Sequence, residues 1–88
     1  MSETTKFGDE LPREEAADLL QELARELRND STADVQVGNK MLTLSPSRTL
    51  EYGIEVEERS PMLGGDREEV TVTLEWAVGE GDTSGNDG

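Results

Sequence analysis

The side chains with the most evident chemistry are carboxylates and hydroxyls that alternate with apolar residues near the C-terminal end. They occupy every second position of two segments, as Glu55, Glu57, Glu69, Thr71, Thr73 and Glu75. A pair of carboxylates can bind Ca²⁺ or Mg²⁺, or serve as acid and base in catalysis. Hard cations need about six or more oxygens in a shaped cage, however, and a flat sheet offers none. The pattern therefore favours a solvated sheet face over a metal or catalytic site.

Other reactive groups are scarce. The chain has no Cys and no His, which removes the thiolate nucleophile, the usual neutral-pH acid and base, and the commonest transition-metal ligands. The serines at 45, 47 and 60 lack a base partner in a recognisable spacing, and there is no phosphate-binding glycine loop. Gly64-Gly65 is internal and indicates a turn. The sequence thus predicts no catalytic residue, no cofactor site and no metal site.

Length and charge restrict the classes of protein further. The 88 residues suffice for one domain, and 21 acidic against 8 basic side chains give a net charge of −13. Such a surface repels phosphate backbones and anionic lipid, so we expect neither direct nucleic-acid binding nor membrane binding. No run of about 18 apolar residues exists, and the N-terminal residues are too polar for a signal peptide. These features predict a cytoplasmic location.

The charge also predicts an environment. Acidic residues are spread through both halves, and only Lys6 and Lys40 are lysines. Repulsion among these charges weakens the folded state in dilute buffer, whereas at 1 M salt the Debye length falls to about 3 Å and most of the repulsion vanishes. The composition therefore favours a halophile's cytoplasm, with an ordinary acidic bacterial protein as the alternative.

Hydrophobic periodicity predicts one helix followed by four strands. The helix starts at Pro12, and its apolar stripe is Ala16, Leu19, Leu20, Leu23, Ala24 and Leu27. From residue 35 the period changes to two, with Gly38-Asn39 as a two-residue hairpin turn that places Val35 opposite Leu42. A tight turn at 46–48 would then place Leu44 opposite Leu50 and Leu42 opposite Tyr52.

The last two strands alternate cleanly, which fixes their register. An antiparallel pairing places four apolar pairs on one face: Leu50 with Trp76, Tyr52 with Leu74, Ile54 with Val72, and Val56 with Val70. A slip by one residue would bury carboxylates instead. Because Trp76 falls in the inward set, a core position is favoured over a ligand-stacking platform.

These elements predict an α+β fold, a two-layer sandwich with one N-terminal amphipathic helix on a four-stranded antiparallel β-meander. Residues 1–8 are predicted to form an N-terminal arm. Whether residues 4–7 within it form an extra short strand is left open. A single domain spans 9–78. The Gly- and Asp-rich tail at 79–88 is predicted to be disordered.

Three segments together resemble the amphi-Trp domain, a compact prokaryotic module common in haloarchaea. They are the helix REEAADLLQELAREL at 13–27, the strand LEYGIEVEE at 50–58, and EVTVTLEW at 69–76, which closes on Trp76. The resemblance covers roughly residues 5–77 and implies the fold and the halophilic setting, with no activity attached. Gly53 within the third strand and the longer loop around Met62-Leu63-Gly64-Gly65 depart from the pattern.

The sequence therefore favours a small non-catalytic protein–protein interaction module over other functions. Its open sheet edges predict a protein partner or a homodimer, with Met62, Leu63, Thr71, Thr73 and Glu75 as the candidate contact residues. One alternative is an acidic mimic of nucleic acid that regulates a DNA- or RNA-binding protein. Another is an enzyme that uses carboxylates alone.

Overall fold

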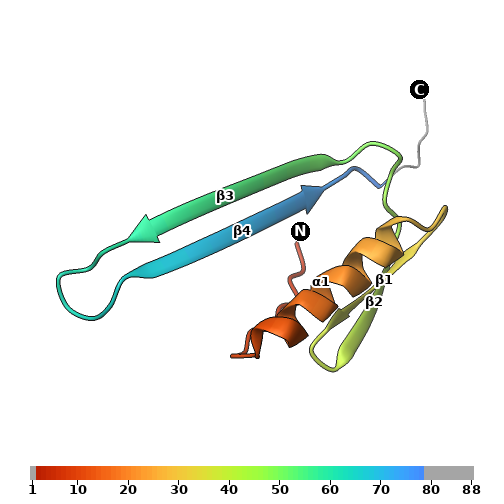
Figure 1. Cartoon of the computed structure of the whole chain (residues 1–88). Coiled ribbons are helices and arrows are strands. Elements are labelled where there is room, and N and C mark those ends of the chain that lie inside the picture. The colour runs from red at the N-terminus through yellow and green to blue at the C-terminus, as the bar shows by residue number, and fades with distance from the viewer. Residues whose placement is uncertain (1, 79–88) are drawn as a thin grey trace. The chain divides into compact units, whose positions relative to one another are not determined.

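The computed structural model describes residues 2–78 and contains one helix followed by four antiparallel strands (Figure 1). The elements are α1 (Arg13–Leu27), β1 (Ala33–Val37), β2 (Lys40–Leu44), β3 (Glu51–Arg59) and β4 (Arg67–Glu75). This confirms the α+β class. The chain divides into two compact units, Met1–Pro46 and Ser47–Gly88, and each is described separately below. The single domain at 9–78 therefore stays a prediction, and the tail at 79–88 lies outside the described residues.

Helix α1 begins and ends where local sequence requires. Pro12 is the N-cap residue in an extended conformation, and its carbonyl accepts a hydrogen bond from the Ala16 amide at 3.0 Å. Glu14 and Glu15 lie in the first turn and Arg25 in the last, each sign matching the helix dipole. After Leu27 the amide of Arg28 bonds to the Arg25 carbonyl at 3.1 Å, which closes the final turn.

Strands β1 and β2 form the predicted hairpin. Val35 pairs with Leu42, and the turn at 38–39 places Gly38 at φ 64°, the left-handed region that type I′ turns require. Helix α1 packs along β1 in the same unit. At this contact Ala33 is 0% exposed, while the neighbouring apolar side chains are half-buried: Leu23, Leu27, Val35, Val37, Leu42 and Leu44.

One glutamate joins the helix to the hairpin. The Glu26 Oε1 accepts a hydrogen bond from the Asp34 amide at 2.9 Å and another from the Asn29 side-chain amide at 3.3 Å. On the other side of β1, the Thr43 hydroxyl donates to the Asp34 carboxylate at 2.7 Å. The polar groups at the start of β1 are thereby bonded to both neighbouring elements.

Gly38 offers a test of this unit. A Cβ at this position would lie 2.9 Å from the Phe7 Cδ1 atom, and the left-handed backbone strains any L side chain. Gly38→Ala is therefore expected to lower the free energy of unfolding by about 1–2 kcal/mol. Urea unfolding followed by the far-UV circular dichroism of α1 measures this change. Gly65→Ala is the matched control, because no atom lies within 4 Å of its added Cβ; an equal loss in both variants would contradict the explanation.

Strands β3 and β4 pair in the register that the alternation predicts. Tyr52 lies opposite Leu74, Ile54 opposite Val72, and Val56 opposite Val70. The fourth predicted pair, Leu50 with Trp76, falls one residue beyond the strand ends. Trp76 is half-buried at that position.

The four antiparallel strands form two sheets of two, β1 with β2 and β3 with β4, and not one continuous sheet. Leu44 pairs with Ala33 and Leu42 with Val35, and no ladder joins β2 to β3 in the described chain. The connection at 45–50 explains the difference. Pro46 has no amide to donate, and the Ser47 hydroxyl donates to the Thr49 carbonyl at 2.7 Å, which forms a local bend and not a tight hairpin turn. Residues 4–7 of the N-terminal arm form no strand.

Candidate functional site

The β3–β4 hairpin carries an exposed apolar face, and this face is the main candidate site. Three consecutive cross-strand pairs line it: Val56 with Val70, Ile54 with Val72, and Tyr52 with Leu74. Five of these side chains are exposed, from 48% for Val72 to 66% for Tyr52, and Leu74 is half-buried. We name these six residues the apolar face. The sequence predicts these residues in a core beneath the helix; within the hairpin's own unit, the described residues supply no second layer over them.

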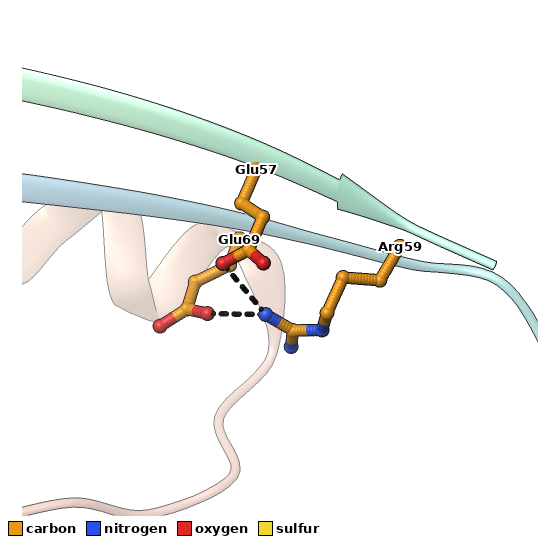
Figure 2. Close-up of polar contacts among 3 residues, drawn as sticks. All are labelled: Glu57, Arg59 and Glu69. Atoms are coloured by element: carbon orange, nitrogen blue, oxygen red, sulfur yellow. Dashed lines mark hydrogen bonds and ion pairs between the residues drawn. The ribbon is translucent and has the colours of Figure 1, made fainter. Parts of the chain in front are cut away.

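The opposite face of the hairpin is polar and carries one ion-pair cluster. Glu57 and Glu69 lie directly opposite each other, and the Arg59 Nη1 binds both carboxylates, at 3.0 Å and 2.9 Å (Figure 2). The three side chains are partly exposed to solvent. Because a guanidinium occupies the space between the two carboxylates, this pair is poorly placed for a cation. Across residues 2–78, no cluster of three or more acidic side chains has metal-binding geometry.

Arg59→Gln tests the cluster. The substitution leaves two opposed carboxylates without a cation, and exposed pairs of this kind contribute roughly 0.2–1 kcal/mol. We expect a loss of that size in dilute buffer and a smaller one in molar KCl, where the repulsion is screened. Urea unfolding followed by Trp76 fluorescence in both buffers measures it. Arg67→Gln is the control, because Arg67 lies opposite Arg59 and has no ion pair among the described residues. A loss that is independent of salt would contradict a charge-based role.

A second acidic pair lies on the same side as the apolar face. Glu58 pairs with Glu68 beside Val56 and Val70, next to the loop at 60–66. Both side chains are exposed, and no ion pair neutralises them in the described residues. The apolar face thus ends in two negative charges at its loop end.

The structure distributes the predicted contact residues over several places. Met62 and Leu63 lie in the loop and are 100% and 90% exposed. Thr71 and Thr73 lie on β4 on the polar face, and Glu75 ends that strand opposite Glu51. The five residues therefore do not form one patch. The apolar face was missed because alternating apolar residues predict a buried core as readily as an exposed binding surface. The signal that could have identified it is the length of β3 and β4, which are longer than β1 and β2.

A groove in the other unit was also missed. It has a volume of about 610 Å³ and lies between α1, β1 and the N-terminal arm, with Phe7, Leu19, Leu20 and Met41 among its apolar lining residues. Asp9 and Glu22 also line this groove. Phe7, which lies against Gly38, belongs to the segment that the sequence predicted as an N-terminal arm.

Comparison with protein-family models identifies the family of this chain. The family model described as the Amphi-Trp domain matches residues 1–87, nearly the whole chain. The chain belongs to the Amphi-Trp domain family. Comparison of this Amphi-Trp protein with curated proteins and with solved structures gives no match. Within the described residues of the Amphi-Trp chain, no helix is long and apolar enough to span a bilayer.

Proposed function

We propose that this Amphi-Trp protein is a small non-catalytic protein–protein interaction module that binds through the β3–β4 hairpin. The observation that carries the proposal is the apolar face, on which three adjacent cross-strand pairs are presented to solvent. Contiguous exposed apolar surface that is bordered by polar residues is typical of interaction sites. Here the border is supplied by Glu58 and Glu68 at the loop end.

The energetics of a hairpin support this proposal. A two-stranded hairpin is at best marginally stable in water, and it gains stability when another layer covers its apolar side. Strands β3 and β4 each have one neighbour, so their outer backbone groups are also open to a further strand. Thr71 and Thr73 lie on the polar face of β4, opposite Glu55 and Gly53, so their side chains are not part of the apolar face.

The proposal includes an environment, the cytoplasm of a halophile. A net charge of −13 with few lysines supports it, because a surface of this kind folds best where salt screens its charges. Three of the cross-strand pairs of β3 and β4 are glutamate with glutamate, at 51 and 75, 57 and 69, and 58 and 68. Directly opposed like charges destabilise a sheet, and molar salt reduces this cost.

Affinity capture in molar KCl with two matched variants tests the proposed function. Val72→Glu places a charge in the centre of the apolar face, whereas Thr73→Glu places the same charge at the next residue on the polar face. The wild type and Thr73→Glu are expected to retain the same bound protein, another copy or a different chain, and Val72→Glu is expected to lose it. Capture that both variants retain equally, or no specific bound protein with the wild type, would contradict the proposal.

A further inference from the structure

The apolar face has a size and a charge distribution that suit a second copy of the same chain. Each of its exposed side chains can bury roughly 100 Å² of apolar surface, so the five exposed members supply on the order of 500 Å² per copy. Two copies face to face would then bury about 1,000 Å², the area at which specific protein interfaces begin. A second hairpin also has the same width and length as the first, which fits a two-fold symmetric contact.

The acidic pair at the loop end decides how the two hairpins would lie. If both loops pointed the same way, Glu58 and Glu68 of the two copies would bring four carboxylates together. If the loops point in opposite directions, each acidic pair lies beyond the Tyr52–Leu74 end of the other copy. The second arrangement keeps the four charges apart, and it places the middle pair, Ile54 and Val72, nearest the two-fold axis.

We propose that two copies of this chain pack face to face through the apolar faces of β3–β4, with the loops at opposite ends. The two hairpins stack as a sheet-on-sheet sandwich about 10 Å apart. This inference rests on the proposed function and names its partner. This face-to-face dimer differs from a dimer paired along the β4 edge, because only the face-to-face contact covers the apolar face and buries Val72.

Salt dependence distinguishes this partner from others. Two chains of charge −13 repel each other in dilute buffer, so self-association through the apolar face strengthens as KCl rises. Binding of a basic protein would weaken under the same change. Sedimentation equilibrium of the full chain is therefore expected to show a monomer–dimer equilibrium that shifts toward dimer from dilute to molar KCl. A monomer at every concentration, or a dimer that salt dissociates, would overturn the inference.

Substitutions locate the dimer contact. Val72→Glu is expected to raise the dimer dissociation constant at least about tenfold, and Thr73→Glu to leave it nearly unchanged. Trp76 fluorescence and circular dichroism check that each variant is folded, and Val72→Thr, which keeps the β-branched shape, is expected to weaken the dimer less than Val72→Glu does. A dimer that survives Val72→Glu, as an edge-paired dimer would, overturns the inference.

Single cysteines give an independent test, because the natural chain contains none. With a short bismaleimide, Val72→Cys is expected to cross-link to itself across the two-fold axis, whereas Thr73→Cys on the opposite face is not. Val56→Cys should cross-link to Tyr52→Cys of a second copy and not to itself, because the loops lie at opposite ends. Self-cross-linking of Val56→Cys would overturn the orientation. If sedimentation shows a monomer while capture of a different protein still depends on Val72, the dimer is wrong and the proposed function stands.

Discussion

Lowering KCl from molar to ten-millimolar concentration is expected to lower the free energy of unfolding of the β3–β4 hairpin by about 1–3 kcal/mol. Three glutamate pairs face each other across this hairpin, and among residues 2–78 only the pair of Glu57 with Glu69 is bridged by an arginine. At 1 M salt the Debye length is about 3 Å, and it grows to about 30 Å at 0.01 M, so their repulsion becomes effective as salt is removed. A hairpin with little stability of its own cannot absorb such a loss.

Urea unfolding followed by Trp76 fluorescence measures this effect, at protein concentrations low enough to exclude dimer formation. The double variant Glu51→Gln, Glu58→Gln removes one charge from each unbridged pair and is the matched control, since glutamine keeps the length of the side chain. It is expected to be less sensitive to salt than the wild type. A wild-type stability that is the same in dilute and molar KCl would remove the halophilic interpretation.

Ala33→Asp is expected to unfold the helix-containing unit. Ala33 is 0% exposed at the contact of α1 with β1, so its replacement by Asp would bury a carboxylate there. Burying an unpaired charge costs several kcal/mol, and a core this small rarely supplies more than about 3–5 kcal/mol in total. The far-UV signal of α1 should therefore fall to that of an unfolded chain under conditions in which the wild type is helical.

Thr32→Asp is the control for this substitution. It introduces the same charge one residue earlier, at an exposed position before β1 begins. Its effect on the helical signal is expected to be small, within about 0.5 kcal/mol, as for other surface substitutions. A folded Ala33→Asp variant with unchanged stability would show that the contact between α1 and β1 is not the core of this unit.

Sequence patterns predicted most of the local structure because local rules determine it. The apolar stripe and the acidic first turn determine α1, and the period of two together with Gly38 determines the β1–β2 hairpin. The register of β3 with β4 follows from one consistent set of cross-strand pairs, with Val56 opposite Val70 as an example. In each case the neighbours that matter are close in sequence or belong to one strand pair.

The arrangement of the sheets could not be predicted in the same way. Whether β2 pairs with β3 depends on the connection at 45–50. There Pro46 and the Ser47 hydroxyl favour a bend, which the alternation of apolar and polar residues does not reveal. The apolar positions of Ile54 and Val72 predict a covered face, but periodicity does not say whether the cover comes from the same chain or from another. The candidate site was missed for this reason, although its residues were identified correctly as one face.

The reactivity of a single thiol at position 72 tests the central claim most directly. Val72→Cys and Thr73→Cys each give the chain one cysteine, on the apolar and polar faces of the same strand. In dilute protein and molar KCl, both are expected to react with a maleimide at similar rates, because both faces are open. Raising the protein concentration should slow the reaction at residue 72 and leave residue 73 unchanged. Slow reaction of residue 72 even in the most dilute protein would show that the face is covered within one chain, and equal rates at every concentration would show that no second copy covers it.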